Sequence, residues 1–299
     1  MVGTLFPGDK RRLNFDDPGC RQTGRRLKTL KEGGSLNIIF FTQEDPFYVK
    51  VFFDEFFSRF KTLSEIKAIV ISAPMGKTSP ARLAKQMYDF YGLYDFLRMG
   101  CRYAYIKVMG RKTLRKSNGA GIPRTYTVRQ VAEAYGLEVI ERSDLNSSDF
   151  REKIGKYDPD LFISVASPII FKGELIKLPR LDCINIHNAP LPKYRGMLPN
   201  FWQLYHGEKE AGITIHRIAE GIDTGDIIAQ HFVPIGAGET LNDLIVKTKK
   251  MGALFMTDVI EDYRHGKITY RKMKGDSSYF TFPKRNDVKI FKQKGQRLL

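Results

Sequence analysis

The fold of this chain is decided by residues 183–196, Cys-Ile-Asn-Ile-His-Asn-Ala-Pro-Leu-Pro-Lys-Tyr-Arg-Gly. The segment begins with residues that favour a strand and then meets two prolines, which continue neither a helix nor a central strand. Alternation along the strand places Asn185 and His187 on one face, at its carboxyl end. In open α/β sheets, ligands bind at the carboxyl ends of the strands. We therefore expect a functional site built around Asn185 and His187.

Apolar runs and amphipathic patterns alternate along the rest of the chain. Buried strands are expected at 36–42, 66–72, 137–140 and 160–166, and helices at 47–60, 127–135, 147–154 and 240–264. This alternation predicts the α/β class, with a doubly wound, mostly parallel sheet. Two further strands, 212–218 and 227–234, flank a loop that carries Asp223. We expect Asn185, His187 and Asp223 to meet and form one active site.

The pattern of these residues resembles the folate-dependent formyltransferases, a family that includes glycinamide ribonucleotide, methionyl-tRNA and sugar-amine formyltransferases. The resemblance rests on Asn-x-His at 185–187, Leu-Pro-x-Tyr-Arg-Gly at 191–196, Thr-x-His at 214–216 and Asp-x-Gly-x-Ile at 223–227. It covers residues 158–228 well and implies a Rossmann-like formyltransferase core. Ala189 and Pro190 stand where the family usually has serine and leucine.

The resemblance implies an N-formyltransferase, a transferase of one-carbon metabolism that moves a formyl group from 10-formyltetrahydrofolate to a primary amine through a tetrahedral intermediate. Asn185 would donate its amide N–H to the oxyanion without adding charge. His187 would carry the amine proton or, when protonated, stabilise the oxyanion. Asp223 would favour the imidazolium form and fix the ring. This chemistry requires no metal, and a His187/His216/His231 metal cluster is disfavoured because a helical His-x-x-x-His pair is missing.

The expected cofactor is 10-formyltetrahydrofolate. In the family, the apolar segment ahead of Asn-x-His lines the pterin pocket, and unbroken counting back from Asn185 gives the corresponding positions here. We also expect the residues directly before Asp223 to contact the cofactor. The predicted cofactor-binding residues are Ile169, Phe171, Ile176, Glu220, Gly221 and Ile222.

The acceptor is predicted from charge. The chain has 299 residues and a formal net charge of +16, which favours an anionic partner, although a basic solvated surface explains the charge equally well. We expect a small, anionic amine such as a nucleotide-linked amino sugar. Aminoacyl-tRNA formylation or RNA binding is the alternative, disfavoured because residues 265–299 are too few for the RNA-binding barrel of the tRNA-formylating members. A formyltetrahydrofolate hydrolase, in which water replaces the amine, is a lesser alternative.

We divide the chain into a basic N-terminal extension (1–35), a formyltransferase catalytic domain (36–264) and a short C-terminal tail with strand-like pieces (265–299). A basic loop is expected at 111–124. The segment 80–110 is atypical of the family, and its apolar residues between Leu83 and Leu97 fit one helix face. This face predicts packing on the core or on a second subunit in a homodimer; a lipid-facing or acceptor-binding surface is the alternative.

The three cysteines are widely spaced and odd in number, which indicates a reducing compartment. No uncharged apolar run reaches the roughly 18 residues of a membrane span. We therefore expect a cytoplasmic protein. The identity of the acceptor amine, the oligomeric state and the roles of 1–35 and 80–110 are not predicted by any motif in the sequence.

Overall fold

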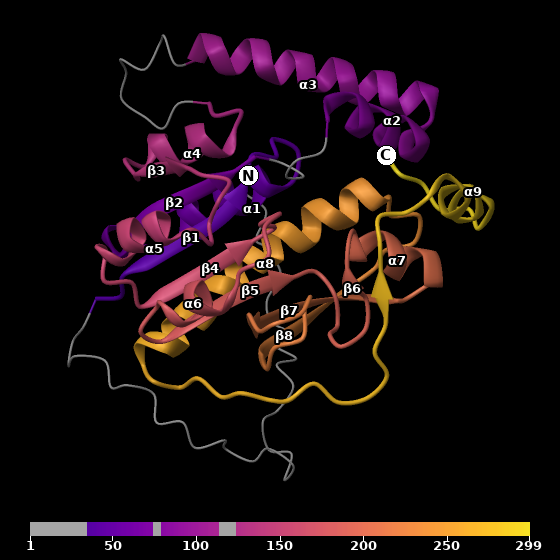
Figure 1. Cartoon of the computed structure of the whole chain (residues 1–299). Coiled ribbons are helices and arrows are strands. Elements are labelled where there is room, and N and C mark those ends of the chain that lie inside the picture. Colours follow the sequence, from indigo (N-terminus) through magenta and orange to yellow (C-terminus); the bar gives the residue numbers. More distant parts are fainter. Residues whose placement is uncertain (1–34, 74–78, 114–123) are drawn as a thin grey trace, which may run out of the picture.

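The computed structural model of this protein describes residues 35–73, 79–113 and 124–299. Within these ranges the main sheet has seven strands in the order β3-β2-β1-β4-β5-β7-β8 (Figure 1). They are β1 (Ile38–Gln43), β2 (Ile66–Ser72), β3 (Val139–Glu141), β4 (Leu161–Val165), β5 (Asp182–His187), β7 (Glu210–Arg217) and β8 (Ile227–Pro234). The first five are parallel, and β7 and β8 are antiparallel. This confirms the predicted doubly wound, mostly parallel α/β sheet.

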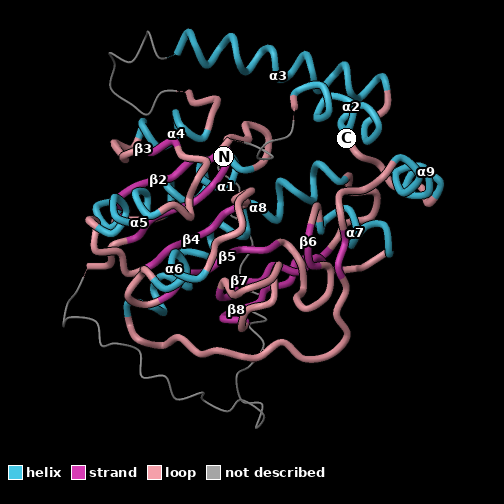
Figure 2. Tube along the Cα trace, in the orientation of Figure 1, coloured by secondary structure: helices cyan, strands magenta, loops and turns pink. Residues whose placement is uncertain are grey.

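Helices cover both faces of the sheet (Figure 2). The helices that the structure describes are α1 (Val49–Arg59), α2 (Pro80–Tyr91), α3 (Leu93–Thr113), α4 (Val128–Ala134), α5 (Ser148–Gly155), α6 (Gly173–Lys177), α7 (Pro199–His206), α8 (Leu241–Arg264) and α9 (Arg285–Gln293). Of these, α2, α3 and α9 lie away from the sheet (Figure 1). Their starts follow from local chemistry: the Thr127 side chain accepts the Gln130 N–H at the start of α4, and Thr240 and Asp243 form a capping box on α8.

The two faces of the sheet bury separate cores, and β1 shows how alternation divides them. Phe40 packs edge-on against Phe53 and Phe56 of α1, in the core that α8 completes. Its neighbour Phe41 points to the opposite face and packs against Phe150 of α5. Each phenylalanine is fully buried, which contributes about 2–3 kcal/mol to folding.

The same alternation in β5 sets the position of the predicted site. Ile184 and Ile186 join the core beneath α1 and α8, whereas Cys183 joins the core beneath α5 and α6. Asn185 and His187 therefore lie on the α5–α6 face, where β5 ends. The antiparallel strand β7 pairs His216 with Asn185 and Thr214 with His187, so two further polar residues arrive beside them.

The prediction of one helix face across 80–110 is wrong, because two helices form there. Gly92, with φ of +78°, follows α2 and turns the chain before α3 begins. This left-handed conformation suits glycine and ends the first helix. Phe90 and Met99 are buried, but Tyr94 and Leu97, which the prediction placed in a packed interface, are exposed in this chain.

The last part of the chain crosses back to the site. A short strand β9 (Tyr279–Phe280) pairs in parallel with β6 (Arg195–Gly196). The indole N–H of Trp202 donates to the Thr281 carbonyl at 3.1 Å, and Phe291 of α9 stacks on Phe201 at 4.6 Å. Strand-like pieces were predicted in 265–299, but α9 was missed, since only Val288 and Phe291 of this polar helix are buried.

Two predicted segments lie outside the described residues: almost all of the N-terminal extension, at 1–34, and most of the basic loop, at 114–123. Among the helices that the structure does describe, none is both long enough and apolar enough to cross a membrane.

Candidate active site

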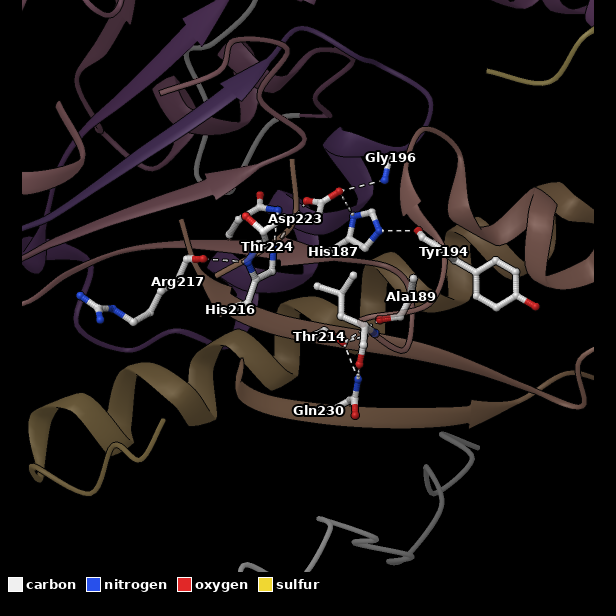
Figure 3. Close-up of polar contacts among 12 residues, drawn as sticks. His187, Ala189, Tyr194, Gly196, Thr214, His216, Arg217, Asp223, Thr224 and Gln230 are labelled. Carbon is white, nitrogen blue, oxygen red and sulfur yellow. Dashed lines mark hydrogen bonds and ion pairs between the residues drawn. The ribbon is translucent and has the colours of Figure 1, made fainter. Parts of the chain in front are cut away.

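A cavity of about 590 Å³ lies at the carboxyl ends of β4 and β5. Asn185, His187, His216 and Asp223 all line it, so the structure brings the three predicted catalytic residues together. The four residues come from three places in the chain: Asn185 and His187 from the end of β5, His216 from the end of β7, and Asp223 from the loop between β7 and β8. Figure 3 shows His187, His216 and Asp223 close together. The position agrees with the general rule that open α/β sheets bind ligands at this edge.

His187 is held in one tautomer by the backbone. Its Nε2 lies 2.9 Å from the carbonyl oxygen of Tyr194, which only accepts, so in the neutral ring Nε2 carries the proton and donates it. Nδ1 is then unprotonated and lies 3.6 Å from Oδ2 of Asp223 (Figure 3). Burial lowers the pKa of His187, and the nearby Asp223 carboxylate only partly opposes this. His187 is thus a neutral base at neutral pH, with a free Nδ1.

Asp223 is ionised and fixed. Burial alone would raise its pKa, but the charges that His187 and His216 carry when protonated and the Gly196 N–H together lower the pKa to about 2. The Gly196 N–H donates to Oδ2 at 2.9 Å. Asp223 itself has a φ of +51°, a left-handed conformation that aspartate tolerates better than most residues. Its carboxylate is therefore placed to stabilise a proton arriving on Nδ1 of His187.

His216 orients the amide of Asn185. Its Nδ1 lies 2.8 Å from the Arg217 carbonyl, so Nδ1 carries the proton of the neutral ring and Nε2 accepts. The Nδ2 group of Asn185 lies 3.2 Å from that Nε2 and donates one of its two N–H groups to it. The second N–H of the same group is then available to the cavity. The contact of His216 with Asn185 was not predicted from the sequence.

The loop after His187 is held by Thr214, the first residue of the Thr-x-His motif. The buried Thr214 hydroxyl donates to the Ala189 carbonyl at 2.6 Å and accepts from Leu191 N–H and Gln230 Nε2 (Figure 3). A Cβ on Gly212 would lie 2.4 Å from the Pro190 nitrogen. The Ala189 side chain is buried, and the proline at position 190 packs closely on the backbone of β7.

One wall of the cavity is apolar and comes from the loop after β4. Ile169 and Phe171 line the cavity, as do Gly221 and Ile222 from the loop that carries Asp223. The other two predicted cofactor residues lie elsewhere. Ile176 is in α6 and packs against the core beneath that helix, while Glu220 is exposed and is not among the lining residues. The volume and apolar walls suit a flat heterocycle such as a pterin.

A lysine that was not predicted from the sequence also lines the cavity. Lys249 of α8 lines the cavity together with Gln43 and Asn188. Burial lowers its pKa to about 8, and Asp45 opposes that shift. Among the described residues, none forms an ion pair or hydrogen bond with its ammonium. The sequence spacing could have indicated this position, because Lys249 is four residues from both Ile245 and Ala253. It therefore lies on the same helix face as these two buried residues.

The arrangement provides three chemical groups around one space: a neutral imidazole with a free Nδ1, an ionised carboxylate beside it, and an amide N–H held by a second histidine. A base, a charge that stabilises its protonated form and a neutral hydrogen-bond donor are the elements of acyl transfer to a nucleophile.

Comparison with known proteins agrees with this geometry. The family model described as formyl transferase matches residues 105–260, about half of the chain. Methionyl-tRNA formyltransferase of Thermodesulfovibrio yellowstonii is 34% identical over 163 residues, which are 54% of this chain and 53% of that protein. The chain therefore spans about half the length of the curated relatives it matches.

Solved structures share the fold. An N-formyltransferase of Helicobacter canadensis, in complex with folinic acid and dTDP-3-aminofucose, aligns with a TM-score of 0.51 and 16% identity over 88% of this chain and 84% of that one. Phosphoribosylglycinamide formyltransferase of Anaplasma phagocytophilum aligns with a TM-score of 0.52 and 15% identity over 83% of this chain and 98% of that one. At these identities the likeness concerns the fold.

Proposed function

This chain belongs to the formyl transferase family, and on that premise we propose that it is an enzyme that transfers a formyl group from 10-formyltetrahydrofolate to a primary amine of a small, anionic acceptor. The observation that carries the proposal is the meeting of Asn185, His187 and Asp223 at one cavity. Fold alone would not carry it, because one fold serves many activities.

The cofactor, when bound, supplies the activated formyl group. Ile169, Phe171 and Ile222 would hold its heterocycle on the apolar wall. Asn185 would donate its second N–H to the formyl oxygen as negative charge develops there. His187 would take the amine proton on Nδ1 as the amine bonds to the formyl carbon, and Asp223 would stabilise the resulting imidazolium from 3.6 Å. The same imidazolium would return the proton to the cofactor nitrogen as the bond between that nitrogen and the formyl carbon breaks. Tyr194 keeps Nε2 protonated throughout and so reserves Nδ1 for this transfer.

The acceptor is proposed to carry an anionic group because of Lys249. This side chain lines the cavity and has no ion-pair partner among the described residues. The Asp45 carboxylate, whose charge raises the pKa of Lys249, already accepts the N–H groups of Phe47 and Tyr48 at 2.8 and 3.2 Å. A phosphate or carboxylate on the acceptor would give the ammonium a charged hydrogen-bond partner.

We expect Lys249→Met to raise KM for an anionic amine about 10- to 100-fold, the effect of losing one hydrogen bond to a charged group. The affinity for a 10-formyltetrahydrofolate analogue should not change. Steady-state kinetics on anionic and uncharged amines would measure this, with Lys250→Met, at an exposed position one residue away, as the matched control. An equal rise in KM for both kinds of amine would contradict an anion-binding role.

The pH dependence should follow the neutral form of His187. Because burial lowers its pKa below the ordinary 6.5, kcat/KM should fall on the acid side only below pH 6.5. Asp223→Asn removes the carboxylate that raises this pKa, so the acid limb should move to still lower pH even as the rate drops. Profiles of both proteins with one amine would cancel the titration of the amine itself. A limb that moved upward in the variant would contradict this assignment.

The function is tested in two steps. Calorimetric titration with a stable 10-formyltetrahydrofolate analogue should show binding, and incubation with 10-formyltetrahydrofolate and a panel of amines should release tetrahydrofolate and a formylated amine. Tetrahydrofolate release without any amine would indicate a hydrolase. A folded protein that neither binds the analogue nor formylates any amine would overturn the proposal.

A second candidate acceptor is an aminoacyl-tRNA. The sequence relatives named methionyl-tRNA formyltransferase and the net charge of +16 favour it. Binding to RNA would then weaken steeply as salt increases, since each phosphate contact releases counterions. Binding that is absent or independent of salt would remove this candidate and leave the small-molecule acceptor.

A further inference from the structure

Helix α3 exposes a continuous apolar stripe. Successive residues of an α-helix are rotated by about 100° around its axis. This rotation places several exposed side chains of α3 along one line, and two exposed tyrosines lie next to that line. Tyr94 is 79% exposed and Leu93 is 62% exposed. The exposed stripe consists of Leu93, Tyr94, Leu97, Cys101, Ala104, Tyr105 and Val108. Exposed apolar patches of this kind usually mark an interaction site.

The opposite side of α3 is anchored to the protein, which fixes the stripe outward. Met99 and Gly110 are buried, and the Tyr103 ring lies 6.3 Å from the Phe47 ring just before α1. The Gly110 carbonyl accepts from the Gln130 side chain of α4 at 2.6 Å. In Figure 1 the helix runs along the outer edge of the molecule, beyond α4. The stripe is therefore held outward by the fold, and the residues that the structure describes leave it exposed, although the Tyr105 ring lies 6.3 Å from the Tyr126 ring.

Exposed cations border the stripe on both sides. By the same helical rotation, Arg98 follows one edge, with Arg102 farther round, and Lys107 and Arg111 follow the other. All four are exposed, although the Arg102 guanidinium also lies 5.2 Å from the Phe47 ring. The acidic residue of α3, Asp95, is partly buried on the anchored side. An apolar stripe between two rows of cations is the arrangement of helices that lie in the interface of an anionic membrane.

We propose that α3 docks this protein peripherally on an anionic lipid surface. The stripe would enter the boundary between headgroups and acyl chains, while Arg98, Arg102, Lys107 and Arg111 would contact lipid phosphates. Each cation near such a surface strengthens binding by about fivefold. A second copy of this chain fits less well, because pairing two α3 helices along the stripe brings cations against cations. The inference concerns a surface away from the cavity and does not depend on the acceptor.

The test is vesicle flotation with the full chain. Vesicles of phosphatidylcholine containing roughly 30% phosphatidylglycerol should carry the protein with them, and the bound fraction should fall as salt rises. Vesicles of phosphatidylcholine alone should carry at least tenfold less. Equal binding to both kinds of vesicle, or to neither, would overturn the proposal.

Two variants and a control assign the binding to α3. Leu97→Asp/Val108→Asp, in the stripe, and Arg98→Gln/Arg102→Gln, on its edge, should each weaken binding to the anionic vesicles at least tenfold. Ser58→Asp/Ala237→Asp makes the same charge change as the first variant at exposed positions outside α2 and α3 and should bind like the parent. Folding is checked by circular dichroism. Parent-like binding by the stripe variant would overturn the proposal.

Light scattering distinguishes lipid docking from pairing with a second copy of this chain. A parent that is a dimer, and a stripe variant that is a monomer, would assign the face to a second copy and overturn lipid docking. A parent and variant of the same mass that differ only in vesicle binding would support it. Titration with the folate analogue should be equal for all proteins, so a failure of lipid docking is distinguishable from a failure of the proposed enzyme activity.

Discussion

Replacing His187 by alanine is expected to lower kcat about 100- to 10,000-fold, the usual contribution of a general base. The loss follows from geometry: His187 offers the cavity an unprotonated Nδ1, because Nε2 is tied to the Tyr194 carbonyl at 2.9 Å. The KM for the amine and the affinity for a folate analogue should change little, since the apolar wall is left intact. Single-turnover kinetics under saturating cofactor would measure the effect.

The matched control for this change is His265→Ala, because His265 is exposed at the end of α8 and is not among the cavity-lining residues. It should behave like the parent. A His187→Ala protein that retains most of its kcat would exclude the base role. Loss of analogue binding together with activity would instead indicate that His187 mainly supports the loop at 188–194.

Asn185→Ala is expected to lower kcat about 100- to 1,000-fold, as for removal of one oxyanion donor. The amide is the neutral donor of the site, with one N–H on His216 at 3.2 Å and the other available to the cavity. Asn185→Asp should be at least as damaging, because a carboxylate would repel the developing charge. Kinetics at saturating amine would measure both, with Asn286→Ala in α9, at an exposed position, as control.

A double-mutant cycle distinguishes donation by Asn185 from a merely structural role. If His216 acts by orienting Asn185, then His216→Ala should lower kcat in the parent protein. In the Asn185→Ala protein, the same change should lower kcat only slightly further. The KM for the amine should be nearly constant across the cycle. Fully additive losses would show that the two residues act independently and would contradict positioning through the 3.2 Å contact.

Much of the fold follows from periodicity. The apolar runs of β1, β2 and β4 and the amphipathic patterns of α1 and α8 predict a parallel sheet with covered faces, as the structure has it. Part of the site can also be predicted from the sequence, because alternation in β5 puts Asn185 and His187 on one face. Gly92 marks the limit of this approach, since the residues around it fit one helix face and only its backbone conformation breaks the helix.

Most of the site contacts that were not predicted from the sequence are made by main-chain groups. The Tyr194 carbonyl fixes the His187 tautomer, and the Gly196 N–H holds Asp223, yet a backbone group leaves no trace in the residue type that carries it. Ile176 shows a different limit. Counting back along the chain from Asn185 assigned it to the cofactor pocket. In the structure Ile176 lies in α6, and its side chain packs against the core beneath that helix.

The pairing of β6 with β9 has a consequence for the order in which the protein is made. Gly196 binds Asp223 through its N–H, and the Arg195–Gly196 segment is held by Tyr279–Phe280, more than eighty residues later in the chain. Chains fold progressively from the N-terminus during synthesis, so the sheet can assemble while this clamp is still being translated. A nascent chain would thus carry a folded sheet before it carries a finished site, and ribosome-bound fragments ending before residue 278 should be inactive.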